Sequence, residues 1–137
     1  MKKLTKNELS SLADSFLFLA QIVGAYRIEN YKQLSPKMQV RIRAYHKILI
    51  DYADTFYARS TNLMIEDATA SITKIQQITR GIKETIRKVE KVQYILNTIG
   101  AATRLGAAII SEQPVAITAS LEEFLSSFKK LKSNTTS

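Results

Sequence analysis

The chain has 137 residues, of which 45% are hydrophobic and 23% charged, with four glycines, two prolines and no cysteine. This length suits one domain with a core that needs no cross-link, and the lack of cysteine excludes disulfides, thiolate metal sites and cysteine nucleophiles. The scarcity of glycine and proline favours long helices over a strand-rich fold. The formal net charge of +8 favours anionic partners: nucleic acid, anionic lipid or acidic protein surfaces.

The first predicted helix has a defined start. Thr5 and Glu8 have the spacing of a capping box, in which each side chain satisfies a free backbone N–H at the position of the other. Apolar residues then recur every three or four positions over residues 9–26, which predicts one apolar stripe along a helix.

The second predicted helix follows directly. Ser35 is placed as an N-cap and Pro36 as the first helical residue, so the boundary between the two helices is expected near Leu34. The three-four spacing continues over residues 42–56 with aromatic residues in the stripe. A weaker boundary is expected near Thr61.

The third segment keeps the three-four spacing without a slip over residues 65–110, in a series that is mostly apolar and includes Thr79, Gln93 and Thr103. A period sustained over that length is typical of a coiled-coil-like seam and predicts one long third helix of about 70 Å. Gly81 or residues 97–100 are the positions at which it would break. Because the other helices would be shorter, part of the seam would lack a partner within the chain, which predicts a homo-oligomer.

A last helix is predicted to begin at Pro114, after a boundary near Glu112. The fold class is therefore all-α, an elongated four-helix bundle with coiled-coil-like packing. Residues 1–132 would form one domain, and residues 133–137 a flexible polar tail.

A basic stripe is the first candidate site. Four cations recur on one side of the third segment, opposite its apolar stripe: Arg80, Lys83, Arg87 and Lys91. Such a row can follow the phosphates of lipid or nucleic acid. The alternative is the ordinary charged outer face of an amphipathic helix.

A segment rich in small residues is the second candidate site. Residues 95–110 combine glycine and alanine with large aliphatic side chains and carry Arg104 as their one charge. Small residues let helix backbones approach closely in water or in lipid. The segment predicts a membrane contact or a tight helix–helix contact, through Ile95, Ile99, Gly100, Gly106, Ile109 and Ile110.

The one histidine is a third, catalytic candidate. Arg41 and His46 enclose four residues, and this spacing resembles the R-x4-H signature of the HEPN ribonucleases, which are small helical bundles. The resemblance implies proton transfer by His46 and phosphate stabilisation by Arg41. It covers six residues, and Ile42 stands where the family usually has a polar residue.

Other chemistry finds no support in the sequence. Arg43 stands where a di-iron site would need a glutamate three residues before His46, and the glycines never cluster into a nucleotide-binding loop. We therefore expect no metal, cofactor or small-molecule substrate. Glu8 and Asp14 argue against a signal peptide, and no apolar run reaches the roughly 20 residues of a spanning helix.

The sequence thus predicts a non-enzymatic, self-associating helical bundle that engages an anionic surface, with a membrane favoured because of residues 95–110. The alternative is a nucleic-acid-binding protein that uses the basic stripe. A HEPN-like ribonuclease is the third hypothesis.

Overall fold

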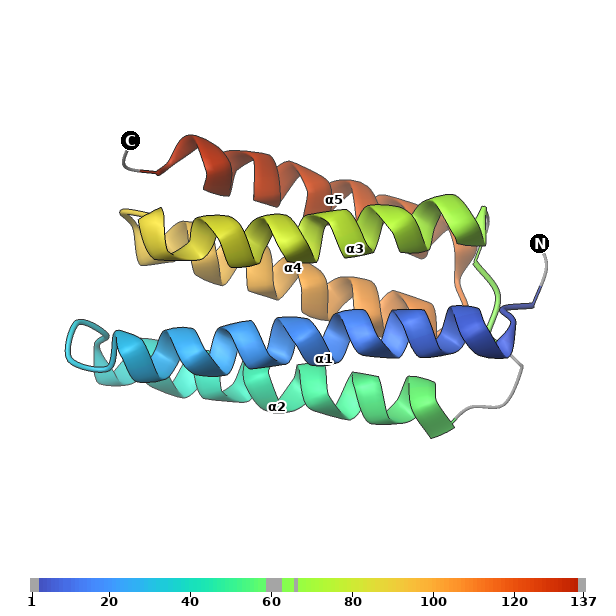
Figure 1. Cartoon of the computed structure of the whole chain (residues 1–137), viewed down its shortest axis with the longest axis horizontal. Helices are drawn as coiled ribbons and strands as arrows, with labels where there is room; N and C mark the ends of the chain where they lie inside the picture. Colours follow the sequence, from blue (N-terminus) through green and yellow to red (C-terminus); the bar gives the residue numbers. More distant parts are fainter. Residues whose placement is uncertain (1–2, 59–62, 66, 136–137) are drawn as a thin grey trace.

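The computed structural model describes residues 3–58, 63–65 and 67–135, and these residues form helices with no strand. The α-helices run alternately in opposite directions along one long axis (Figure 1). The predicted all-α class is confirmed, whereas the predicted number of four helices is wrong. Five α-helices and one short 3-10 helix are present: α1 (Lys6–Glu29), α2 (Pro36–Ala58), α3 (Ala68–Thr85), η1 (Ile86–Lys88), α4 (Val92–Ile110) and α5 (Pro114–Ser133).

The predicted helix starts are confirmed where a capping residue marks them. The Thr5 hydroxyl accepts a hydrogen bond from the Glu8 N–H at 3.1 Å, and the Glu8 carboxylate accepts one from the Thr5 N–H at 2.8 Å. Ser35 accepts from the Met38 N–H at 3.2 Å ahead of α2, and Pro114 is the first residue of α5. The caps at Thr5 and Ser35 satisfy donors that a helix N-terminus would otherwise leave unpaired, whereas Pro114 has no N–H to satisfy.

The predicted long third helix is wrong, because the chain reverses between α3 and α4. The α-helix ends at Thr85, and after η1 the backbone is extended at Val89 (φ −74°, ψ 129°). Neither Gly81 nor residues 97–100 interrupt a helix, since both lie inside one. The reversal has no glycine or proline, which is why the sequence gives no stop signal there.

Contacts from the end of α5 hold this reversal. The Glu90 N–H donates to the backbone carbonyl of Asn134 at 3.0 Å, and the Lys91 N–H donates to the Asn134 side-chain oxygen at 3.0 Å. Val89 and Thr135 form an isolated antiparallel bridge. Of the polar tail predicted at residues 133–137, Ser133 is the last residue of α5, and Asn134 and Thr135 make these contacts with the reversal.

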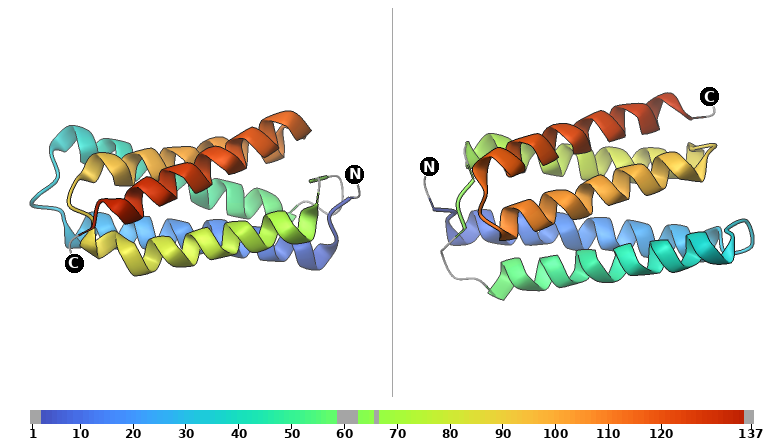
Figure 2. Two further views of the ribbon diagram at one scale, coloured as in Figure 1. Left: turned by 90° about the horizontal axis from the view of Figure 1, so that it is seen from above. Right: turned by 180° about the vertical axis from the view of Figure 1, so that it is seen from behind.

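The helices form a closed ring around the core. Going round it, α2 packs on α1, α1 on α3, α3 on α5, α5 on α4, and α4 on α2 (Figures 1 and 2). The two halves of the predicted seam are therefore each covered by other helices of the same chain. This removes the uncovered seam on which the prediction of self-association depended. The boundary predicted near Thr61 lies outside the described residues.

The ring encloses a continuous apolar core. The Phe16 ring packs edge-on against Phe56 and Tyr52, with centroids 5.3 and 6.0 Å apart, which joins α1 to α2. Thr98 on α4 is buried, and its hydroxyl lies 2.8 Å from the Tyr94 carbonyl and 3.3 Å from the Ser127 carbonyl on α5. Among the described residues, no buried side-chain nitrogen or oxygen lacks a hydrogen-bond partner.

Two glycines allow close approach between helices. A Cβ atom on Gly81 would lie 2.2 Å from the Phe128 ring of α5, and one on Gly106 would lie 2.3 Å from the Tyr52 ring of α2. Gly81, considered in the sequence as a break in a helix, is therefore a packing position. The small residues of α4 have the same role at the α2–α4 contact.

Replacing Gly106 with alanine is expected to lower the stability of the fold by about 1–3 kcal/mol, because the added methyl group overpacks a buried contact. This would outweigh the intrinsic helix preference for alanine, which is about 1 kcal/mol. Gly100→Ala is the matched control, since its Cβ would meet the hydroxyl end of the half-buried Tyr45 at 3.2 Å and the end of the Arg104 side chain at 3.4 Å, and no atom closer than these. Chemical denaturation of both variants tests this, and an unchanged or raised stability of Gly106→Ala would contradict it.

Candidate anion-binding surface

Charge is segregated along the long axis of the bundle. The alternating helix directions bring the end of α1, the start of α2, the end of α3 and the end of α5 to one end of the molecule (Figure 1). We call this the basic half. It contains fourteen Lys and Arg and three Glu among residues 27–47, 80–91 and 129–132. The acidic half contains four Lys and Arg and eight Asp and Glu among residues 3–14, 51–58, 67–74 and 104–123.

Three of the four cations of the predicted stripe lie along a groove between α1 and α3. Arg80 borders a hollow of about 470 Å³, while Lys83 and Arg87 border the next, of about 400 Å³. Phe18 contributes to both hollows. Arg80, Lys83 and Arg87 therefore lie next to α1 and form one wall of this groove.

Contacts with α1 fix two of these side chains. The Lys83 ammonium lies 5.3 Å from the centre of the Phe18 ring, within cation–π range. Arg87 forms an ion pair with Glu29 at 2.7 Å, between side chains that are 76% and 42% exposed. An exposed pair of this kind contributes roughly 0–1 kcal/mol. Its main effect is to connect the end of α1 to η1.

Lys91 is separated from the other three cations by the reversal. It is exposed, at the position before the first residue of α4, and its backbone N–H is held by Asn134. The four predicted residues therefore belong to the same end of the molecule but do not form one straight row.

Further cations of the basic half were not proposed as a site from the sequence. Lys129, Lys130 and Lys132 end α5, and Phe128 beside them packs against Gly81 of α3. The exposed cations of the α1–α2 region add to them: Lys32, Lys37, Arg41, Arg43 and Lys47. The available signal was the composition of residues 27–47, with six basic residues and one acidic residue.

Most of the second candidate segment, residues 95–110, lies in the core, while Asn97, Arg104 and Ala107 are exposed. Ile95, Ile99 and Ile109 are at most 1% exposed. Gly100 and Gly106 are buried against side chains of α2, and Ile110 is half-buried. These residues thus make helix–helix contacts in this structure.

The structure directs Arg41 and His46 to different neighbours. An Arg41 guanidinium nitrogen donates to the Tyr45 hydroxyl at 3.3 Å, whereas the His46 ring lies against Gly24 of α1. Five residues along an α-helix correspond to a rotation of about 140°. The two side chains are therefore not brought together on this helix, and a shared site would need other contacts.

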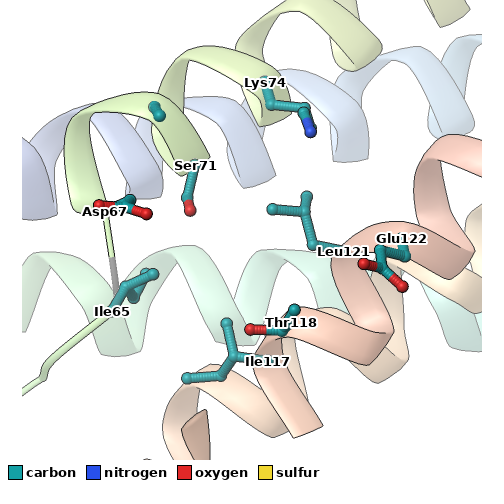
Figure 3. A pocket seen from close by; sticks show the side chains of 9 residues that line it. Ile65, Asp67, Ser71, Lys74, Ile117, Thr118, Leu121 and Glu122 are labelled. Atoms are coloured by element: carbon teal, nitrogen blue, oxygen red, sulfur yellow. The ribbon is translucent and has the colours of Figure 1, made fainter. Parts of the chain in front are cut away.

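A further groove opens in the acidic half, between the starts of α3 and α5 (Figure 3). It measures about 290 Å³, with Lys74 and Glu122 on opposite walls and Leu121 between them. Among the described residues, no group of three or more His, Asp and Glu side chains is arranged to hold a metal ion.

The sequence predicted no membrane-spanning helix, yet α1 meets the length and composition criteria for one, alone among the helices of the described residues. The core helix of a soluble protein and an N-terminal signal sequence meet the same criteria. Here 56% of the most apolar stretch of α1 is buried inside the bundle.

Comparisons with known proteins give no family assignment: no protein-family model, no curated protein and no solved structure matches the chain.

In the acidic half, a hydrogen bond from the Tyr57 hydroxyl to the Asp14 carboxylate joins α2 to α1. This bond, burial, and the charges of Asp14 and Asp54 together raise the pKa of Tyr57 to about 12. A raised tyrosine pKa means that folding favours the protonated form. The stabilisation is complete below pH 10, the ordinary tyrosine value, and is lost as the pH rises through about 12.

Replacing Asp14 with asparagine should move the pKa of Tyr57 down towards 10, because the carboxylate acceptor and its charge are both removed. Phenolate absorbance during an alkaline titration measures this. Asp51→Asn is the control, since Asp51 is exposed on α2 and does not contribute to the shift. An unchanged titration of Asp14→Asn would show that the hydrogen bond does not set this pKa.

Proposed function

We propose that the protein acts by binding and not by catalysis, and that its basic half docks onto an anionic surface that presents many phosphates. The observation that supports this is the segregation of charge, with a formal charge of +11 in the basic half and −4 in the described part of the acidic half. A field of this kind attracts a polyanion and orients the molecule towards it.

The exposure of the cations supports the proposal. Within the basic half every lysine is exposed, and the three acidic residues are too few to neutralise the cations. One of them, Glu29, is already paired with Arg87. Each lysine or arginine close to an anionic membrane contributes about 1 kcal/mol of attraction, and each phosphate neutralised on a nucleic acid releases counterions. A few such contacts give measurable affinity.

The contacts around the candidate catalytic residues also favour binding. His46 packs on Gly24 and Arg41 bonds to Tyr45, so neither makes a contact with the other that would support acid–base chemistry.

The test compares charge reversals in the two halves. One variant carries Lys83→Glu, Arg87→Glu and Lys91→Glu. The matched control carries Lys3→Glu, Lys6→Glu and Lys74→Glu, which are exposed positions of the acidic half. Both variants lower the net charge by the same amount. We expect the first to weaken binding to anionic vesicles by about a hundredfold or more, and the control to change it by no more than about threefold.

Circular dichroism and thermal unfolding establish that both variants fold. Equal losses in the two variants would contradict the proposal, because binding would then follow net charge and not its position. Duplex DNA and RNA serve as further probes at matched salt. Binding to nucleic acid with a steep salt dependence, but not to vesicles, would assign the basic half to nucleic acid.

A further inference from the structure

Three large apolar side chains are exposed at the extreme end of the basic half. Ile28 is 73% exposed, Tyr31 58% and Val40 64%. Ile28 lies in the last turn of α1, Tyr31 in the connection and Val40 in the second turn of α2. We call these three residues the apolar tip. They are three of the five exposed large hydrophobic residues among those described.

The tip is a built element of the fold. The Gln39 side-chain amide donates to the Tyr31 carbonyl at 3.0 Å and to the Leu34 carbonyl at 3.4 Å. The Asn30 side chain and backbone N–H both donate to the Tyr26 carbonyl at 3.0 Å. Hydrogen bonds that span the connection hold its backbone in one shape. The apolar side chains are therefore presented to solvent by an ordered turn.

Exposed cations adjoin the residues of the apolar tip in sequence. Lys32 lies in the connection, Lys37 in the first turn of α2, and Arg41 one residue after Val40, all three exposed. The nearest carboxylate in sequence, Glu29, is occupied by Arg87. Aliphatic side chains and a tyrosine next to cations match the two parts of an anionic bilayer surface. The apolar groups suit the acyl-chain boundary, and the cations suit the lipid phosphates.

We propose that the apolar tip inserts into the interfacial region of an anionic lipid bilayer, so that the bundle docks by its basic end. The proposal rests on the function proposed above and specifies its partner. The charge complementarity favours docking by the basic half, because the acidic half is repelled by the same lipids, and insertion of the tip selects the orientation. A phosphate backbone has no apolar layer to receive Ile28 and Val40, and this favours lipid over nucleic acid.

The chain has no tryptophan, so one introduced tryptophan reports on one position. Tyr31→Trp places it in the tip. Val115→Trp is the control, since Val115 is 85% exposed at the start of α5, in the acidic half. The probe is a phosphatidylcholine vesicle with roughly one third phosphatidylserine and with brominated acyl chains. We expect Tyr31→Trp to show a blue-shifted emission that bromine quenches, and Val115→Trp to show neither.

A second pair of variants tests the contribution of the tip to affinity. Val40→Ser and Val115→Ser make the same chemical change at opposite ends of the bundle. Loss of the inserted apolar surface should weaken vesicle binding by roughly three- to tenfold for Val40→Ser. Val115→Ser should leave it unchanged.

The outcomes separate this inference from the function on which it rests. If the parent protein binds anionic vesicles with salt sensitivity, but Tyr31→Trp is unquenched and Val40→Ser binds like the parent, tip insertion is overturned and surface docking remains. If the parent protein binds no anionic vesicles at any salt concentration, the membrane partner is excluded together with insertion. Quenching of Val115→Trp in place of Tyr31→Trp would reverse the orientation and overturn the inference.

Discussion

The reversal between α3 and α4 is the constraint on which the rest of the structure depends. It is held by two hydrogen bonds from the backbone of Glu90 and Lys91 to Asn134, at the far end of the sequence. Without it, the apolar residues of α3 and α4 would form one helix much longer than its partners. With it, α4 returns to pack on α2 and α5, and the ring of five helices closes. The same reversal brings Arg87 beside Glu29 of α1 and Lys91 beside the end of α5, so it also assembles the basic half.

Much of the fold could be predicted from local signals. The capping box at Thr5, the N-cap at Ser35 and Pro114 each mark a helix start that depends on residues close in sequence. The reversal could not be predicted, because it depends on a contact over 43 residues between Lys91 and Asn134. The apolar spacing also gives no sign of the reversal. Both α3 and α4 turn their apolar faces inward, and the three-four spacing continues from one helix to the next. The role of Gly81 was misjudged for a related reason: only the neighbouring Phe128 distinguishes a packing glycine from a helix-breaking one.

The candidate site was predictable in its parts but not in its arrangement. Arg80, Lys83 and Arg87 form a basic run that any reader of the sequence can find. The segregation of charge needs the helix directions, since the α1–α2 region, α3 and the end of α5 are far apart in sequence (Figure 1). Residues 95–110 led to a membrane prediction through their composition alone. Their burial against Tyr45 and Tyr52 accounts for that composition by packing within the chain. The observation that favours a membrane is instead the exposure of apolar side chains that do not pack in the core, those of Ile28, Tyr31 and Val40.

Geometry decides which cations act in docking by this end. Lys88 is the last residue of η1, before the reversal. At the standard helix rise, Arg80 lies about 12 Å from Lys88 along the helix axis, which is more than the Debye length of about 8 Å at physiological ionic strength. When the apolar tip touches a bilayer, Lys32 and Lys37, which adjoin the tip in sequence, are close to the lipid phosphates, while Arg80, at the inner edge of the basic half, is largely screened. A molecule lying on its side would bring Arg80 to the lipid as well, but would leave Ile28, Tyr31 and Val40 without a common contact. The apolar tip therefore adds the short-range attraction that selects one orientation, whereas the charges alone act at longer range and favour one half of the molecule without fixing its angle.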